Sequence, residues 1–183
     1  AIVIGTSLGA HITQELALAR PDVVRAAVMI ATYGRNTPLQ EAISAGERAL
    51  YDQGITLPPA YEAAITAHLN LSPTTLDDDR SARDWLDIIG FSPQTITPGV
   101  RAQLELHNKE SNRLAAYRGI TRPALVVGFA DDRTLPAKLA REVAEAIPGA
   151  EYVEIERAGH FGYLEQPAEV NRVLVEFCER HRA

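Results

Sequence analysis

The sequence has 183 residues, 46% of them hydrophobic, which is enough for one globular domain with a buried core. Its formal net charge of -6, with no block rich in lysine or arginine, argues against a nucleic-acid partner, because phosphate binding depends on clustered positive charge. Cys178 is the only cysteine, so neither an internal disulfide nor a cysteine-based zinc site is expected, and a reducing, cytoplasmic location fits. No apolar run approaches the roughly 18 residues of a membrane-spanning helix, and no export signal is visible, so no membrane partner is expected.

The chain opens with an apolar strand, "AIVI", which reaches Gly5. A helix is predicted from Leu8 to Arg20, where Pro21-Asp22 ends it, and "VVRAAVMIA" then predicts a buried strand. The side chains of this helix that are expected to face the core are Ile12, Leu16 and Ala19.

Residues 34–117 have a helical pattern that predicts about four helices and no obvious strand. Breaks are expected at Pro58-Pro59, at Ser72-Pro73 and at Thr97-Pro98-Gly99. The acidic run 77–79 is typical of the solvated first turn of a helix, where carboxylates suit the helix dipole.

Strands and helices alternate again after this block. "RPALVVGFADD" predicts a buried strand, "LPAKLAREVAEAI" a helix, "AEYVEIE" a strand and "QPAEVNRVLVEFCERH" an amphipathic closing helix. Its inward side chains are expected to be Val170, Val173, Leu174 and Phe177.

This order of elements predicts an α/β fold with a mostly parallel sheet flanked by helices. Residues 1–33 and 118–183 would form the core, and residues 34–117 would be a helical lid inserted between two strands. Such an insertion is expected over the carboxyl ends of the strands, where open parallel sheets bind their ligands.

The stretch from Gly5 to Gly9 has the pattern G-x-S-x-G between a strand and a helix, which is the pattern of a nucleophile elbow. Ser7 would be the nucleophile, and the backbone N–H of Leu8 would face the charge that develops on a carbonyl oxygen, as one donor of an oxyanion hole. The alternative interpretation is an ordinary strand-to-helix turn that uses the same two glycines.

Two later stretches favour the catalytic interpretation. In "GFADDRTLP" the acidic pair Asp131-Asp132 follows a buried strand, and in "ERAGHFGYLEQP" His160 follows the next strand. The chain order Ser, Asp, His is the order expected for a nucleophile elbow fold. An imidazole can take the serine proton and later return it to the leaving group, while a carboxylate fixes the tautomer of the imidazole.

The sequence resembles the α/β-hydrolase superfamily, in which the acid commonly stands four residues before a proline in a stretch like D-R-x-x-P. The resemblance implies that the acid is Asp132, which precedes Arg133 and Pro136. Asp131 would then cap or orient the loop, and the alternative for it is a turn aspartate bonded to its own backbone.

Several stretches resemble the cofactor-free, haloperoxidase-like (bromoperoxidase-like) branch of that superfamily: "GVRAQL", "NRLAAYRGITRPALVVGFADDRTLP", "AGHFGYLEQPAEVNRVLVEF" and the lid stretch "YDQGITLPPAYEA". The resemblance implies an acyl-enzyme on Ser7, formed from a small-molecule acyl substrate. Water would release it, or hydrogen peroxide would release it as a peracid, with no heme, metal or other cofactor. The same triad serves esterases, lactonases, carbon-carbon bond hydrolases and perhydrolases.

Three functional hypotheses therefore stay open. The first is a lidded serine hydrolase acting on small esters, with perhydrolysis as an added activity. The second is an enzyme that hydrolyses a carbon-carbon bond or an enol-lactone. The third is a non-catalytic ligand receptor with the hydrolase fold.

The sequence departs from the family at its start, because members carry several strands and helices before the elbow. A complementary N-terminal polypeptide is therefore expected, which would pair with residues 1–4 and supply the second donor of the oxyanion hole.

Other residues are ambiguous. His11 is expected near Ser7 on the first helix, and His68 and His107 in the lid lack ligand-spaced partners. Cys178 is expected to be a small buried hydrophobe. Three aromatic residues either line an acyl pocket or pack between lid helices: Tyr61, Trp85 and Phe91.

Overall fold

The computed structural model describes residues 1–91, 97–105 and 112–182. At its centre is a parallel sheet with the strand order β1 (Ile2–Thr6), β2 (Ala26–Ile30), β3 (Ala124–Phe129) and β4 (Glu151–Ile155). Every residue of β2 and β3 is buried, as expected for inner strands of a sheet covered on both faces. The predicted parallel α/β fold is confirmed.

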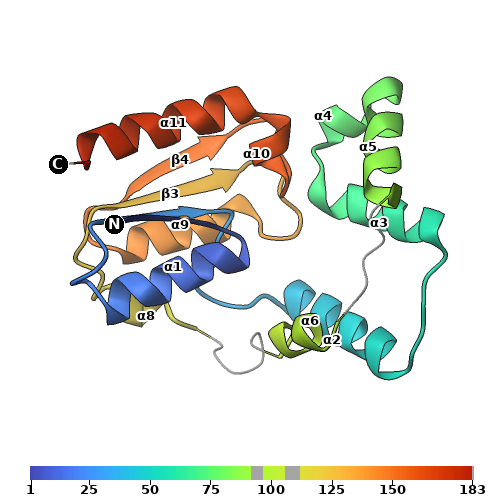
Figure 1. The fold of residues 1–183 in the computed structure, drawn as a ribbon, viewed down its shortest axis with the longest axis horizontal. Coiled ribbons are helices and arrows are strands. Elements are labelled where there is room, and N and C mark those ends of the chain that lie inside the picture. Colours follow the sequence, from blue (N-terminus) through green and yellow to red (C-terminus); the bar gives the residue numbers. More distant parts are fainter. Residues whose placement is uncertain (92–96, 106–111, 183) are drawn as a thin grey trace.

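Helices cover both faces of the sheet (Figure 1). One face packs against α1 (Leu8–Ala19), α8 (Leu114–Tyr117) and α9 (Ala137–Ala146), and the other packs against α11 (Pro167–Arg180). Alternate residues of β2 divide between these two cores, with Met29 on the α1 side and Val28 on the α11 side. The predicted inward face of α11 is confirmed: Val170, Val173 and Phe177 are buried, and Leu174 packs against them.

The predicted inward face of α1 is confirmed at Leu16, which packs against the core, but is wrong at Ile12 and Ala19. Ile12 is 58% exposed and Ala19 is also exposed, whereas the buried residues of the helix are Ala10, Thr13, Gln14 and Ala17. Two of these are polar and have internal partners: Thr13 Oγ1 donates to the Gly9 carbonyl, and Gln14 Nε2 donates to the Tyr33 carbonyl. Apolar periodicity failed because this helix buries small and hydrogen-bonded side chains against the sheet.

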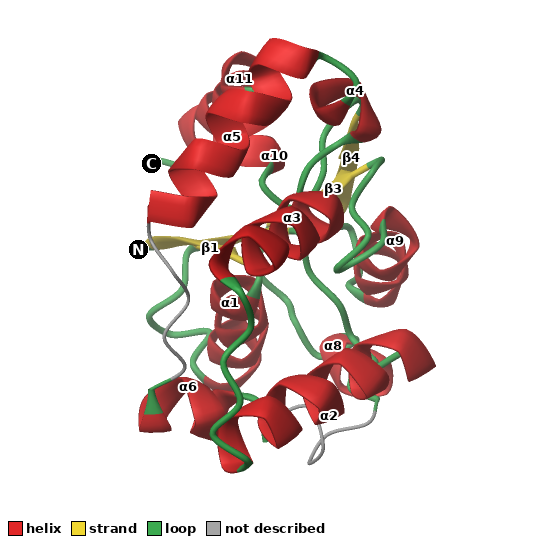
Figure 2. Cartoon of the chain, turned by 90° about the vertical axis from the view of Figure 1, so that its right-hand side faces the viewer, coloured by secondary structure: helices red, strands yellow, loops and turns green. Residues whose placement is uncertain are grey.

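A group of helices separates β2 from β3 in the sequence: α2 (Pro38–Asp52), α3 (Pro59–Asn70), α4 (Pro73–Leu76), α5 (Asp79–Phe91) and α6 (Pro98–Gln103). Four of them begin at a proline, a residue pre-organised for the first helical position. The three predicted breaks are confirmed, although α4 divides the block into more pieces than expected. Figures 1 and 2 show these helices beyond the carboxyl ends of the strands, where the lid was predicted.

Within the described residues, no helix is both long enough and apolar enough to cross a membrane.

Candidate active site

Ser7 lies on the sharp turn between β1 and α1. Its φ of 54° falls in the left-handed region, which residues other than glycine seldom adopt. The Ser7 backbone N–H donates to the Ile30 carbonyl at the end of β2, over 2.9 Å, and this bond fixes the turn against the neighbouring strand. The Ser7 side chain forms no capping hydrogen bond with α1, so its hydroxyl group is available for another partner.

The two glycines of the motif differ in their surroundings. A Cβ atom on Gly5 would lie 2.1 Å from the Gly9 carbonyl oxygen and 2.5 Å from Thr13 Oγ1, so only glycine lets the strand and the helix approach this closely. A Cβ atom on Gly9 would meet nothing within 4 Å. The elbow therefore requires its first glycine for packing but not its second.

The structure brings Ser7, His160 and Asp132 together at the carboxyl edge of the sheet. His160 Nε2 lies 3.0 Å from Ser7 Oγ, and His160 Nδ1 lies 2.7 Å from Asp132 Oδ2. His160 and Asp132 are both buried, with 8% and 4% of their surfaces exposed. Because a carboxylate only accepts hydrogen bonds, Nδ1 carries the proton toward Asp132, which leaves Nε2 free to accept the hydroxyl proton of Ser7.

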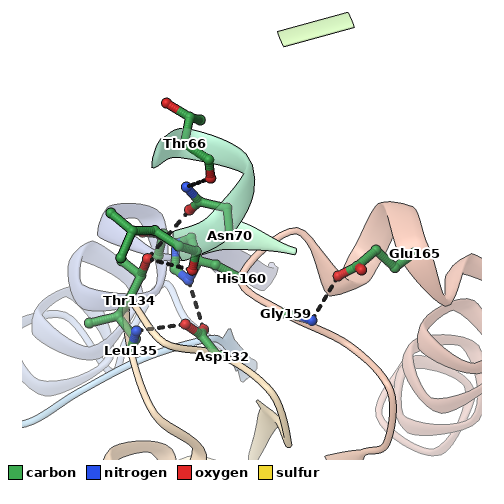
Figure 3. Close-up of polar contacts among 10 residues, drawn as sticks. Thr66, Asn70, Asp132, Thr134, Leu135, Gly159, His160 and Glu165 are labelled. Carbon is green, nitrogen blue, oxygen red and sulfur yellow. Dashed lines mark hydrogen bonds and ion pairs between the residues drawn. The ribbon is translucent and has the colours of Figure 1, made fainter. Parts of the chain in front are cut away.

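The second oxygen of Asp132 is also occupied. Oδ1 accepts a hydrogen bond of 2.7 Å from the backbone N–H of Leu135, so the carboxylate is held at both ends (Figure 3). This rigidity matters because an imidazole is oriented only as well as the group that holds it.

Asp131 has a different role from its neighbour. Its Oδ2 accepts a hydrogen bond of 2.6 Å from Ser72 Oγ, at the start of α4, and its backbone N–H donates to the Ala158 carbonyl. The carboxylate therefore binds the helical insertion, and the expected alternative of a turn aspartate bonded to its own backbone is not what the structure contains. Asp131 joins the loop after β3 to the helical insertion.

The last turn of α3 lies between the two loops that carry Asp132 and His160 (Figure 3). The Asn70 carbonyl accepts a hydrogen bond from the Phe161 backbone N–H at 2.9 Å, and Thr134 Oγ1 donates to the Leu69 carbonyl. A Cβ atom on Gly159 would lie 2.5 Å from the same Asn70 carbonyl, so the helical insertion and the histidine loop are in close backbone contact. The insertion is thus part of the framework of the site.

Glu165, in α10 (Gly162–Glu165), is a residue that the sequence analysis missed. Its Oε2 accepts from the Gly159 backbone N–H at 2.7 Å, and its Oε1 accepts from the Ser72 backbone N–H at 2.9 Å and from the Thr75 hydroxyl at 2.5 Å. One carboxylate therefore binds both the loop of His160 and the helical insertion. In the sequence, the only sign of this role is that an acidic residue stands five positions after the histidine. That spacing by itself does not predict contacts with the histidine loop or with Ser72.

A cavity of about 210 Å³ lies beside Ser7. Ser7 and Leu8 of the elbow, one face of α2, residues near α6 and the loop after β3 line its wall. Burial raises the pKa of Glu47, one of the α2 residues in this wall, above the usual value for a carboxyl group. The volume is sufficient for a small acyl group.

The aromatic residues considered for an acyl pocket do not line this cavity. Phe91 is 89% exposed and Tyr61 is 56% exposed, while the Trp85 ring lies 6.4 Å from the ring of Phe161. The position of Trp85 therefore favours packing between the helical insertion and the histidine loop.

The other histidines and the cysteine have ordinary surroundings. The ring of His11 stacks on Tyr33 with 5.2 Å between centroids, and His68 lies 2.9 Å from a guanidinium nitrogen of Arg133. His107 lies outside the described residues, and Cys178 is partly buried. Across the described ranges, no group of three or more His, Cys, Asp or Glu side chains is arranged to hold a metal ion.

Comparisons with known proteins identify the family of this chain. The model of the alpha/beta hydrolase family matches residues 1–173, and the chain belongs to that family. It is 44% identical to the Mycobacterium tuberculosis protein named "Putative non-heme bromoperoxidase BpoC", over 96% of this chain and 66% of the relative. The crystal structure of that protein matches with a TM-score of 0.95 and 42% identity, and the match covers 100% of this chain and 68% of the other.

A more distant relative is the pimeloyl-(acyl-carrier protein) methyl ester esterase of Chromobacterium violaceum, which is 29% identical over 97% of this chain and 69% of the relative. The chain therefore spans about two thirds of the length of these relatives. The comparisons support an enzyme of the α/β-hydrolase class with bromoperoxidase and esterase relatives.

Proposed function

We propose that this chain carries the catalytic residues of a serine hydrolase that forms an acyl-enzyme on Ser7 from small esters. The observation that carries the proposal is the pair of hydrogen bonds in series, from Ser7 Oγ to His160 Nε2 at 3.0 Å and from His160 Nδ1 to Asp132 at 2.7 Å. A serine hydroxyl is a weak nucleophile, and a base held in this position removes its proton as it attacks.

In the first step, Ser7 Oγ attacks the ester carbonyl while His160 Nε2 takes the hydroxyl proton. The negative charge that develops on the carbonyl oxygen would meet the backbone N–H of Leu8, because the first residues of a helix have N–H groups without acceptors inside the helix. His160 then gives its proton to the leaving alcohol. Asp132 holds the imidazole in the required tautomer and stabilises its positive charge.

In the second step, water attacks the acyl-enzyme, with His160 again acting as the base, and the carboxylic acid leaves. Hydrogen peroxide attacking in place of water would release a peracid, which oxidises bromide. The bromoperoxidase name of the 44% identical relative supports this second outcome, and the esterase relative supports the first.

The test is intact-mass spectrometry after treatment with a fluorophosphonate, on the wild type and on Ser7→Ala. A single adduct on the wild type that is absent from Ser7→Ala is the expected result. A folded wild type that acquires no adduct would contradict the proposal and leave the ligand-receptor hypothesis in its place. Bromination assayed with acetate, bromide and hydrogen peroxide would then separate perhydrolysis from simple hydrolysis.

We also propose that a complementary polypeptide pairs with β1. In the described part of the sheet, β1 pairs only with β2, and its Ile4 side chain is 47% exposed. The opposite edge strand, β4, carries Glu151 and Glu154, charges that protect an edge against pairing, whereas β1 carries none. The occupant would be a segment equivalent to the part of the relatives that this chain does not span.

The probe for this partner is the part of the bromoperoxidase relative outside the 175 aligned residues, expressed as a separate chain. We expect it to bind this chain and to bind Ile4→Lys at least about tenfold more weakly, because the substitution places a charge on the apolar edge. The matched control is Val23→Lys, whose side chain is 44% exposed in the loop before β2. Failure of the wild type to bind the segment, together with full activity of the chain alone, would contradict the proposal.

A further inference from the structure

Glu47 lies on the side of α2 that borders the cavity beside Ser7. Four residues of this helix line the cavity, at the intervals that share one side of a helix: Gln40, Ile43, Ser44 and Glu47. Burial raises the pKa of the Glu47 carboxyl group above its ordinary value. The charged end of the side chain, and not only its aliphatic stem, therefore lies partly inside the protein at the cavity wall.

The Glu47 carboxylate has no partner among the described residues. Neither a hydrogen bond nor an ion pair joins it to another described side chain or backbone group. The nearby cations are engaged elsewhere, because Arg48 donates to the Leu104 carbonyl and Arg101 pairs with two carboxylates outside the cavity wall. Among the described residues that line the cavity, Glu47 is also the only charged one. Its charge therefore determines which ligand charge the cavity favours.

A partly buried carboxylate such as that of Glu47 is unfavourable unless a positive charge or hydrogen-bond donors compensate it. The described part of the chain supplies neither, so the compensating group can come from a molecule bound in the cavity. Ser7 lines the same cavity, and an acyl chain attached to Ser7 is therefore placed to reach Glu47. The volume of about 210 Å³ accommodates a short chain that ends in a compact cation.

This inference rests on the acyl transfer proposed above. We infer that Glu47 is a specificity-determining residue whose carboxylate binds a cationic nitrogen on the acyl chain of the substrate. The substrate class is then a small ester with an amine-bearing acyl chain, in preference to a neutral ester of the same shape. The attraction between the two charges acts where water is partly excluded and is therefore stronger than in bulk water. A neutral chain in the same place would displace water from the carboxylate without replacing its interactions, which is the physical basis of the selectivity.

The experiment compares 4-nitrophenyl methyl phosphonates that modify Ser7 directly, so its readout does not depend on turnover. Ser7 Oγ bonds to phosphorus and 4-nitrophenolate leaves. The phosphorus carries either a 2-(trimethylammonio)ethyl group or the neutral 3,3-dimethylbutyl group of the same shape, and a second pair of probes has one more methylene. The rate constant of Ser7 modification is measured by intact mass and divided by the rate constant of hydroxide hydrolysis of the same probe. This division removes the inductive effect of the cation on the phosphorus.

Two variants accompany the wild type. Glu47→Gln removes the charge and keeps the shape of the side chain. The matched control is Glu41→Gln, the same substitution at an exposed glutamate of the same helix that does not line the cavity. Both variants change the net charge of the protein equally. A difference between them therefore reports the position of the carboxylate and not the total charge.

We expect the cationic probe of at least one pair to label the wild type about fivefold faster than its neutral partner, the size of an ion pair that solvent partly screens. This preference should be lost in Glu47→Gln and kept in Glu41→Gln. A wild-type ratio near 1 in both pairs, a ratio that survives in Glu47→Gln, or an equal loss in both variants would overturn the inference while labelled Ser7 leaves the proposed hydrolase intact. No labelling of Ser7 by any probe would overturn the inference and the proposed function together.

Discussion

The Gly159 backbone N–H donates a hydrogen bond of 2.7 Å to Glu165 Oε2, across the loop that carries His160. The other oxygen of the same carboxylate accepts from the Ser72 backbone N–H, at the start of α4. The position of the imidazole is therefore linked through a single side chain to the position of the helical insertion. Glu165 does not touch Ser7 and acts as a positioning residue.

We expect Glu165→Gln to slow fluorophosphonate labelling of Ser7 by about tenfold. An amide replaces one acceptor oxygen with a donor, so either Gly159 or Ser72 loses its partner, at a cost of about 1–3 kcal/mol in the free energy of unfolding. Labelling is measured at a temperature where the variant is fully folded, so that slower labelling reports on the position of His160. Glu179→Gln, at an exposed glutamate of α11, is the matched control. Labelling of Glu165→Gln at the wild-type rate would show that the histidine loop holds its geometry without this carboxylate.

Asp132→Asn is expected to reduce the labelling rate by about 10⁴-fold, the size seen when the acid of such a triad is made neutral. In the wild type, the Leu135 N–H donates to Asp132 Oδ1 and His160 Nδ1 faces Oδ2. In the variant, the Leu135 N–H still requires an acceptor, so the amide oxygen would take the place of Oδ1. The amide nitrogen would then face His160 Nδ1. Two donors cannot pair, and the imidazole would move its proton to Nε2, where it could no longer accept from Ser7.

The adjacent Asp131→Asn provides the control for that variant. Asp131 accepts from the Ser72 hydroxyl, and an asparagine oxygen can accept from it equally well. We expect the labelling rate of Asp131→Asn to stay within about threefold of the wild type. If the two substitutions reduced labelling equally, the assignment of Asp132 as the catalytic acid would be wrong.

The two glycines of the elbow predict opposite outcomes for the same substitution. Gly5→Ala would place Cβ against the Gly9 carbonyl, which is backbone that cannot rotate away, and we expect a loss of at least about 3 kcal/mol in unfolding free energy. Gly9→Ala meets open space within α1 and should stabilise the helix by up to about 1 kcal/mol. Urea unfolding of both variants measures the difference. Equal destabilisation would mean that the motif needs both glycines for packing.

The arrangement of Ser7, Asp132 and His160 could be expected from the sequence, because each follows a strand and the carboxyl ends of parallel strands meet at one edge of the sheet. Choosing which aspartate faces His160 required the resemblance to a family, since Asp131 and Asp132 occupy the same stretch of sequence. Side-chain directions were less predictable. Ile12 has the spacing of a core residue but is exposed, because α1 buries Gln14 in its place.

The contribution of Glu165 depends on a contact between segments far apart in the chain. Glu165 binds Ser72, 93 residues away, and no periodicity in the sequence indicates that contact. Sequence patterns locate the elements well, but they do not locate the side chains that meet between them.

Glu47 gives a prediction with a defined pH dependence. Burial in the cavity wall raises the pKa of its carboxyl group above the ordinary value. The neighbouring cations have other partners: Arg48 donates to the Leu104 carbonyl, and Arg101 is paired with Asp52 and Glu105. A carboxyl group with a raised folded pKa binds more protons in the folded than in the unfolded state, so the stability of the wild type falls as the pH rises through the interval between the two pKa values.

Glu47→Gln removes this effect because an amide does not ionise. At pH 4, where the carboxyl group is largely protonated in both states, the variant and the wild type should unfold at similar urea concentrations. At pH 8 the variant should be more stable, by no more than about 1 kcal/mol because the site is partly open to solvent. Glu156→Gln, at an exposed loop glutamate, should show no such divergence. A variant that is less stable than the wild type at pH 8 would mean that the Glu47 carboxylate has a stabilising partner in solution.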